Sequence, residues 1–365
     1  MSEIFGKIYS KQELAEYTGS MSQLAGIRAC ELEDGRAKGT SCFDIRTGSG
    51  LDFSVIKDRC LDIAWASFKG TPISHITKTG IAAPWFFEPQ ENGWFRTYFA
   101  GLLTTCGLSN TGAFCEDDGE RYGLHGRISN TPAEAVAVRE YWEGNEYRMQ
   151  VTGSMRESRF YGENLLLTRT ITTALGWKKF IIHDRVENQG FEPVPVMILY
   201  HFNIGFPLLS ENSELIISAL KTDFYDDAAR QGASDMFRFQ KPTHGYFRQV
   251  FFHSLRNDEQ GNTQVMVVNR NIGKDFLGLY LKFNHEQLPE FFEFKMMGQG
   301  DYELGLEPSN CLPMGRAFEK SRKGLKYIEG QTAQDFEIEV GIIETEEEAR
   351  GMAATIGAFK DKRSS

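Results

Sequence analysis

The sequence predicts an all-β protein, and three observations lead to this fold class. Apolar and polar side chains alternate with a period of two over residues 51–55 and again over 336–342, which is the pattern of a strand with one buried face. Many further runs rich in Val, Ile, Phe and Thr are separated by Gly, Asn and Asp turns. Helical periodicity is scarce. Many short strands at close spacing are typical of a sandwich or barrel.

The individual strands follow from the same pattern in chain order. The expected strands occupy residues 51–55, 135–142, 147–153, 165–173, 180–186, 194–201, 215–220, 249–253, 265–268, 276–283, 291–296 and 336–342. Helices are expected only near the two ends. Ser10 and Glu13 form a capping-box pattern, and Thr345 and Glu348 form another before residues 349–356, since a hydroxyl at the N-cap and a carboxylate three residues later satisfy free backbone amides.

The chain has the length for two domains, but its pattern favours one. Sandwiches and barrels can form a single domain of several hundred residues, and no Pro-, Ser- or Gly-rich linker, internal repeat or low-complexity tract divides these 365 residues. We therefore expect an N-terminal segment with a short helix at 1–25, a continuous β domain at 26–343, and a C-terminal helix and tail at 344–365.

Charge and hydropathy exclude several classes of partner. The chain has 40 Lys plus Arg against 50 Asp plus Glu, a formal charge of −10, and it lacks a basic block that would neutralise phosphates. No nucleic-acid partner is predicted. The N-terminus has no basic segment followed by an apolar run, and no apolar stretch approaches the eighteen residues of a membrane span. The sequence thus predicts a cytoplasmic protein without a membrane partner.

The cysteines and glycines predict neither a metal nor a cofactor. The six cysteines contain no C-x-x-C and are not clustered in the sequence, as expected for free thiols in a reducing compartment. Residues 47–50 begin like a dinucleotide fingerprint, but Phe53 stands where the third glycine would be. The sequence also lacks a P-loop, a zincin motif and a serine-hydrolase elbow.

Two titratable residues stand out as candidates for proton transfer. His201 ends the apolar run 194–200, where a strand is expected to meet a loop, and its unperturbed pKa suits it to exchange protons near neutrality. Glu307 precedes Pro308, which favours an extended backbone; burial would make its carboxylate a stronger base. The alternatives are a buried histidine bonded to the backbone and an ordinary Glu-Pro surface loop.

Four further residues are candidates for binding a substrate. His125 and Arg127 lie in Gly-Leu-His-Gly-Arg, and in a strand their side chains would share one face; the alternative is a turn with an exposed arginine. Arg59 offers a fork of donors, although it could equally form ion pairs with neighbouring aspartates at a strand end. Asp226 could bind hydroxyls or simply be solvated. Aromatic residues at 85–87 and Trp94 could stack on a sugar ring, or form core.

These motifs carry a resemblance to a known family. Residues 58–62, 99–108, 123–127, 200–203 and 305–308 resemble the aldose 1-epimerase-like proteins of the DUF4432 group, within the galactose mutarotase-like superfamily. The resemblance runs from about residue 26 to 343 and implies a β-supersandwich. It implies that His201 is the general acid and Glu307 the general base, and that His125, Arg127 and, on a looser match, Asp226 orient the substrate.

The resemblance and the residues predict the same chemistry. Exchanging the anomers of an aldose needs a base at the anomeric hydroxyl and an acid at the ring oxygen, and it needs no cofactor. Galactose mutarotases have a different sequence around both groups, so galactose itself is not implied. Two alternatives remain: a non-catalytic carbohydrate-binding protein, and a glycoside hydrolase or lyase, which would need a second carboxylate. A small sugar is the expected partner in each case.

Overall fold

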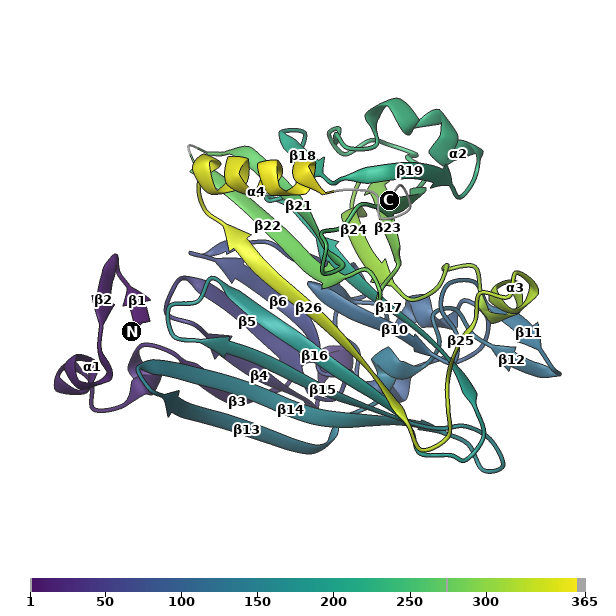
Figure 1. Ribbon diagram of the computed structural model, residues 1–365, viewed down its shortest axis with the longest axis horizontal. Helices are drawn as coiled ribbons and strands as arrows, with labels where there is room; N and C mark the ends of the chain where they lie inside the picture. The colour runs from purple at the N-terminus through teal and green to yellow at the C-terminus, as the bar shows by residue number, and fades with distance from the viewer. Residues whose placement is uncertain (1, 274, 360–365) are drawn as a thin grey trace.

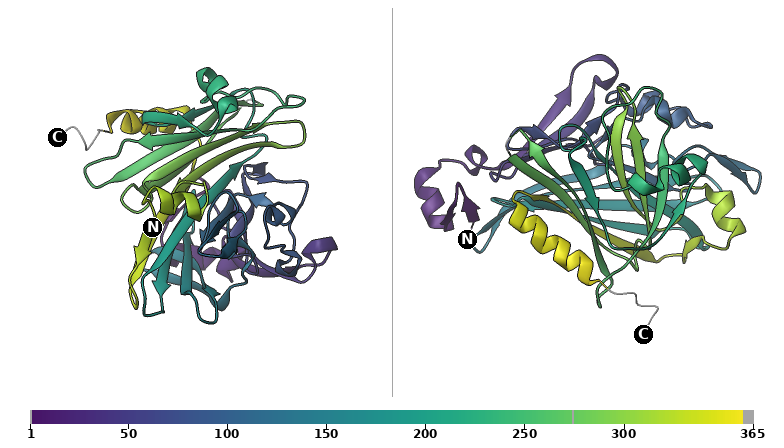
Figure 2. Two further views of the ribbon diagram at one scale, coloured as in Figure 1. Left: turned by 90° about the vertical axis from the view of Figure 1, so that its right-hand side faces the viewer. Right: turned by 90° about the horizontal axis from the view of Figure 1, so that it is seen from above.

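The structure, a computed structural model, describes residues 2–273 and 275–359. Within them the chain is built mainly of antiparallel strands that form two large sheets, one of twelve strands and one of eight. Figures 1 and 2 show that the helices lie at the margins of this body of strands. The predicted all-β fold is confirmed.

The larger sheet contains the two strands that carry His201 and Glu307. Its strand order is β19-β20-β23-β24-β17-β10-β6-β5-β4-β3, with β25 beside β17 and β7 beside β6. Its strands are β3 (Gly26–Leu32), β4 (Thr40–Arg46), β5 (Leu51–Ile56), β6 (Asp62–Phe68), β7 (Thr71–Pro72), β10 (Leu103–Leu108), β17 (Val194–Ile204), β19 (Ala219–Phe224), β20 (Gln249–Leu255), β23 (Glu290–Met297), β24 (Tyr302–Ser309) and β25 (Lys326–Ile328).

The smaller sheet has the strand order β13-β14-β15-β16-β26-β22-β21-β18. Its strands are β13 (Glu134–Glu143), β14 (Glu146–Ser158), β15 (Asn164–Ala174), β16 (Lys179–Asn188), β18 (Ser213–Ile216), β21 (Asn262–Ile272), β22 (Asp275–Asn284) and β26 (Ala333–Ile343). Every strand predicted from the alternation lies in one of the two sheets, except that the run 215–220 is split between β18 and β19.

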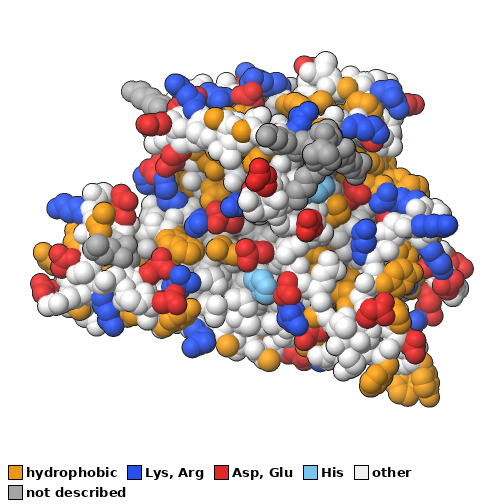
Figure 3. Space-filling view, in the orientation of Figure 1, with side chains coloured by type: hydrophobic (Ala, Val, Ile, Leu, Met, Phe, Trp, Pro, Cys, Tyr) orange, Lys and Arg blue, Asp and Glu red, His pale blue; other side chains and the backbone are white. Residues whose placement is uncertain are grey.

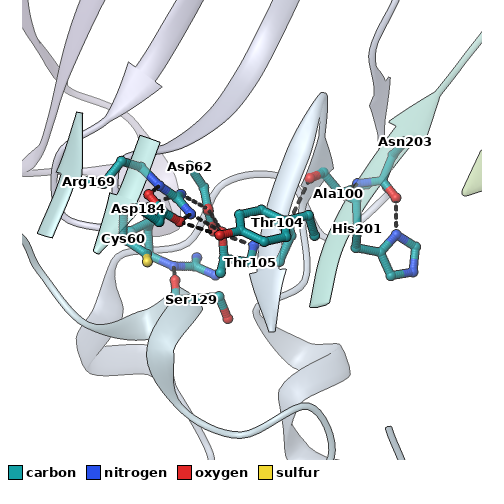
Figure 4. Close-up of polar contacts among 12 residues, drawn as sticks. Cys60, Asp62, Ala100, Thr104, Thr105, Ser129, Arg169, Asp184, His201 and Asn203 are labelled. Atoms are coloured by element: carbon teal, nitrogen blue, oxygen red, sulfur yellow. Dashed lines mark hydrogen bonds and ion pairs between the residues drawn. The ribbon is translucent and has the colours of Figure 1, made fainter. Parts of the chain in front are cut away.

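The main core lies between the two sheets. Buried side chains from both sheets form one apolar cluster, and the rings of Phe53 on β5 and Phe180 on β16 lie 4.6 Å apart within it. A buried ion cluster also joins the sheets (Figure 4). Arg169 on β15 donates to Asp184 on β16 at 2.6 Å and 2.9 Å and to Asp62 at 2.9 Å, and it donates to Thr105 at 2.8 Å.

Short elements cover the margins of the sheets. The helices are α1 (Lys11–Tyr17), α2 (Asp227–Gln231), α3 (Arg316–Ser321) and α4 (Glu346–Ala358), and the remaining strands form the pairs β1 (Ser2–Ile4) with β2 (Lys7–Tyr9), β11 (Cys115–Asp117) with β12 (Glu120–Tyr122), and β8 (His75–Ile76) with β9 (Ala100–Gly101). The predicted terminal helices are confirmed as α1, capped by Ser10, and α4, capped by Thr345. The end of the expected tail, 360–365, lies outside the described residues.

Two features of the structure concern the charge distribution and the helices. On the face shown in Figure 3, acidic and basic side chains are interspersed. None of the helices in residues 2–273 and 275–359 has the length and apolar content needed to cross a membrane.

Candidate functional site

His201 and Glu307 occupy facing positions on neighbouring strands of the larger sheet. β17 and β24 pair antiparallel, with Phe202 opposite Leu306, and this register places His201 across from Glu307. Residues that face each other across an antiparallel pair project their side chains from the same face of the sheet. The strand pairing itself therefore brings the two titratable side chains together, although they are far apart in the sequence.

The two side chains are in direct contact and shielded from solvent. His201 Nε2 lies 3.3 Å from Glu307 Oε1, and the two side chains are only 7% and 5% exposed. Gly305 makes this contact possible, because a Cβ atom there would lie 2.9 Å from Glu307 Oε1 and 3.0 Å from His201 Cε1. A glycine two residues before the carboxylate is thus a steric requirement of the pair.

Asn203 fixes the orientation of the His201 ring. Its amide nitrogen donates to the His201 carbonyl at 2.9 Å, so its oxygen faces His201 Nδ1, with which it is in hydrogen-bond contact (Figure 4). An amide oxygen can only accept, and Nδ1 must therefore carry a proton. His201 Nε2 then faces Glu307 Oε1 with either a lone pair or a proton. The imidazole and the carboxyl group therefore share one proton between these two atoms.

A second carboxylate and a tyrosine lie on the other side of the imidazole. The Tyr98 hydroxyl lies 2.7 Å from Glu303 Oε1, 2.9 Å from Asn203 Oδ1 and 3.4 Å from His201 Nδ1. Glu303 in turn lies 3.9 Å from His75 Nε2. Glu303 and Glu307 are four residues apart on β24 and so share a face, but their contacts place them at opposite nitrogens of the His201 ring.

Aromatic rings enclose the pair. Trp94 stacks on Tyr98 with ring centroids 4.4 Å apart and lies 4.6 Å from the ring of His125. The His125 ring lies 6.2 Å from that of His201 in an edge-on arrangement. Phe294 lies 5.9 Å away on the β23 side. Trp94, which the sequence offered as either a sugar-stacking aromatic or a core residue, is buried in an apolar cluster and contacts the pair only through Tyr98 and His125.

His125 and Arg127 diverge, contrary to the expectation that they line one wall. Gly-Leu-His-Gly-Arg is a turn and not a strand: His125 and Gly126 have φ of +56° and +71°, so the alternation of faces does not apply. His125 Nδ1 accepts from the Gly112 amide at 3.2 Å, which leaves the Nε2 proton as its donor. Arg127 is exposed and lines a separate groove that also contains Glu157.

Arg59 is buried and bonds to the backbone of the segments next to the site. Its guanidinium donates to the carbonyls of Ser129, Ala82 and Thr97 at 2.6 Å, 2.7 Å and 3.0 Å, and its residue is 1% exposed. In this structure it is not accessible to a substrate. It instead holds the segment that carries Trp94 and Tyr98, and Ser129 also accepts from the Trp94 indole at 3.1 Å.

Asp226 lies apart from the pair and is occupied by structural contacts. Its Oδ1 caps helix α2 by accepting from the Ala229 amide at 3.0 Å, and its Oδ2 forms an ion pair with Arg248 at 3.0 Å. Of the six residues predicted from the sequence, the structure brings together His201, Glu307 and His125.

Burial shifts the pKa of each titratable group in the direction that favours its uncharged form. Burial, followed by the charge of Glu303, raises the pKa of Glu307 well above its usual range. Burial lowers the pKa of His201 to about 4, and burial with the neighbouring His201 lowers that of His125 to about 3. The pKa of Glu303 rises to about 7, chiefly through burial. Shifts of this kind, produced by several groups at one place, are typical of functional sites.

The structure corrects the expected position of His201 and confirms the extended backbone expected at Glu307. β17 continues past His201 to Ile204, so the imidazole projects from within a strand. Glu307 and Pro308 lie within β24 and not in a loop. Tyr98, Asn203 and Glu303 are not among the residues predicted from the sequence. The last two could have been found, because His201-x-Asn203 and Glu303-x-Gly305-x-Glu307 each place their members on one face of a strand; no local pattern marks Tyr98.

Comparison with known proteins identifies the family. A family model described as a domain of unknown function, DUF4432, matches residues 37–342. The chain belongs to this family. No curated protein matches it.

Solved structures share the fold of this DUF4432 protein. A “putative aldose 1-epimerase” from Klebsiella pneumoniae subsp. pneumoniae has a TM-score of 0.87 at 23% identity, covering 92% of this chain and 88% of the other. A galactose mutarotase-like protein from Clostridium acetobutylicum has a TM-score of 0.61 at 14% identity, covering 88% and 100%. Galactose 1-epimerase from Lactobacillus acidophilus has a TM-score of 0.54 at 14% identity, covering 88% and 99%. At these identities the likeness establishes the galactose mutarotase-like fold.

Proposed function

We propose that this protein is an aldose 1-epimerase-like isomerase that exchanges the anomers of a sugar by general acid and base catalysis. The observation that carries the proposal is the contact between His201 Nε2 and Glu307 Oε1 at 3.3 Å, with the tautomer of the imidazole set by Asn203. An acid and a base this close can act on the ring oxygen and the anomeric hydroxyl of one sugar, since these oxygens are bonded to the same carbon.

The shared proton supplies both catalytic groups at once. When it lies on His201 Nε2, the imidazolium is the acid and the Glu307 carboxylate is the base. Glu307 then removes the proton of the anomeric hydroxyl while His201 protonates the ring oxygen, and the bond between this oxygen and the anomeric carbon breaks. Rotation of the open-chain aldehyde and reversal of both transfers close the ring on the other face. Each group returns to its starting state.

Other residues would orient the sugar. The Nε2 proton of His125 is available as a donor because its Nδ1 accepts from the Gly112 amide, and the buried ring of Trp94 packs against the imidazole. The family resemblance also implies Arg127 and Asp226 as substrate-orienting residues. Arg127 lines a separate groove, and Asp226 caps α2 and pairs with Arg248, so the proposed mechanism gives neither residue a role.

The contacts favour isomerisation over hydrolysis. Glu303 provides the second carboxylate that a glycosidase would need, but it contacts Tyr98 on the Nδ1 side of His201, while Glu307 is on the Nε2 side. The imidazole therefore separates the two carboxylates, which would have to flank one glycosidic bond.

The deciding experiment compares anomer exchange with sugar binding in matched variants. Exchange NMR over a panel of aldoses first identifies an accepted sugar. Glu307→Gln and His201→Asn should each lower the exchange rate by about 10²-fold or more, with sugar affinity retained, and the double variant should lose less than the product of the two effects. Glu259→Gln, an exposed carboxylate, is the control. A Glu307→Gln protein that exchanges every accepted sugar at the parental rate would favour the carbohydrate-binding alternative.

A further inference from the structure

Three side chains of kinds that can bind a metal converge on one face of β3 and β4. These are the last two strands of the larger sheet (Figure 1). Cys30 on β3 lies directly opposite Cys42 on β4, so the two side chains leave the sheet on the same face. Asp44 follows two residues after Cys42 and shares that face. The ligand atoms of the three residues lie within 4.8 Å of one another, and Cys30 Sγ is 3.3 Å from Asp44 Oδ2.

The spacing suits a tetrahedral zinc ion. Zn²⁺ binds thiolate sulfur at about 2.3 Å and carboxylate oxygen at about 2.0–2.2 Å, which places neighbouring ligand atoms of a tetrahedron about 3.3–3.8 Å apart. The observed spacing is reached from this geometry by small side-chain rotations. Two ligands at i and i+2 on one strand and one on its neighbour form a triangle, and the fourth position lies above the sheet.

The surroundings hold the ligands as a metal site requires. The Ser54 hydroxyl donates to Asp44 Oδ1 at 2.5 Å, which fixes the carboxylate with Oδ2 toward Cys30; such supporting bonds are characteristic of metal ligands. Cys42 is buried against Ile56 and Phe99, so its sulfur has few alternative positions. Cys30 is half-buried and Asp44 exposed, which leaves the outer side of the triangle open.

The charge of Asp44 is not neutralised by a basic side chain. Arg28 stands opposite Asp44 in the register of β3 and β4, yet within residues 2–273 and 275–359 no Lys or Arg forms an ion pair with Asp44, whose bonds are to Ser54 and Cys30. Asp44 and Ser54 also line a surface groove of about 610 Å³, so the Asp44 side of the triangle opens onto it.

We propose that Cys30, Cys42 and Asp44 form a Zn²⁺ site with one coordination position open to solvent. On binding, each thiol loses its proton to solvent and forms a Zn–S bond, and Asp44 Oδ2 supplies the third ligand. The site is separate from the proposed acid and base, which project from β17 and β24. Eleven residues separate the two cysteines in the sequence, and this spacing resembles no common zinc motif.

The test is metal binding to the reduced, metal-stripped full-length protein. Calorimetry with Zn²⁺ should give one ion per chain, and Co²⁺ should give the near-ultraviolet charge-transfer band of thiolate coordination. Ser54→Ala should weaken Zn²⁺ binding by about tenfold or more, and loss of a ligand in Cys30→Ala or Asp44→Asn should exceed about 100-fold. Cys115→Ala removes another partly exposed thiol and should bind as the parent does.

Several results would overturn the site. Among these are the absence of Zn²⁺ binding under reducing conditions, binding that survives in both Cys30→Ala and Asp44→Asn, and a Co²⁺ complex without the thiolate band. No Cys42 variant is used, because Cys42 is buried and replacing it would also change the stability of the fold. Cys30 and Asp44 are accessible enough to be replaced, and thermal unfolding with and without Zn²⁺ shows whether each variant is folded: the parent should be stabilised by the ion, and the two ligand variants should not.

Discussion

His201 Nε2 lies 3.3 Å from Glu307 Oε1, and the antiparallel register of β17 and β24 produces this contact. A pair placed by strand register is held by the main chain on both sides. Its geometry therefore depends on Gly305, which leaves room for the ring, and on Asn203, which sets the tautomer.

The pH dependence of anomer exchange should be bell-shaped, because only the pair with one shared proton can act. A second proton on the pair charges His201, whose pKa is lowered to about 4 by burial, so kcat/KM should fall on the acid side near that value. On the alkaline side the pair loses its shared proton, so kcat/KM should fall again, in the range set by the raised pKa of Glu307. The two limbs belong to the coupled pair. A profile following one ionisation near pH 6.5 would contradict the shared proton.

Glu303 should make the protein less stable as the pH rises. Its folded pKa of about 7 lies above its ordinary value of 4.5, so its contribution to stability is complete below pH 4.5 and is lost as the pH rises through 7. Glu303→Gln keeps the acceptor for Tyr98 but cannot ionise. Relative to the parent, it should gain about 3 kcal/mol between pH 4.5 and 8. Urea unfolding at both pH values measures this difference, which Glu259→Gln should not show.

His125 and Arg127 should differ in their effects although they share one motif. His125→Ala removes a donor beside the pair and should raise KM more than it lowers kcat. Arg127→Ala alters a side chain that points to another groove and should leave both constants within about twofold, as surface substitutions usually do. Steady-state exchange kinetics on the same sugar test both variants. A large rise in KM for Arg127→Ala would restore it as a substrate-binding residue.

Arg169 should be far more important for stability than an exposed arginine of the same sheet. Arg169→Leu leaves Asp62 and Asp184 buried without their partner, and breaking such a cluster costs about 3–5 kcal/mol. Arg185→Ala removes an exposed pair with Asp335 and should cost less than about 1 kcal/mol. Urea unfolding of both variants measures the difference. Equal losses would mean that the buried cluster does not join the sheets energetically.

Much of the fold was predictable because strand periodicity is local. Residues 336–342 alternate in the sequence and form part of β26, and the capping patterns at Ser10 and Thr345 both start helices. β24 is absent from the strands expected from the sequence, because Glu307-Pro308 indicates only an extended backbone. Pairing with β17 and β23 makes this segment a strand inside the larger sheet.

The site was predicted in part for the same reason. His201 and Glu307 were found because each is a polar residue in apolar sequence, and Glu303 could have been found by counting alternate positions on its strand. Tyr98 could not, because it reaches Glu303 from a segment over two hundred residues away. Arg59 was misjudged because a sequence does not show which carbonyls surround a guanidinium.

The sequence by itself determined the strands with clear alternation, such as residues 336–342, and which residues have the chemistry of an acid and a base. These properties depend on neighbours within a few positions. Only the tertiary structure decided that His201 faces Glu307, that Cys30 faces Cys42, and that Arg127 turns away from His125. Pairing between distant strands, and burial that shifts a pKa, are set by the whole chain, because they depend on which segments the two sheets bring side by side.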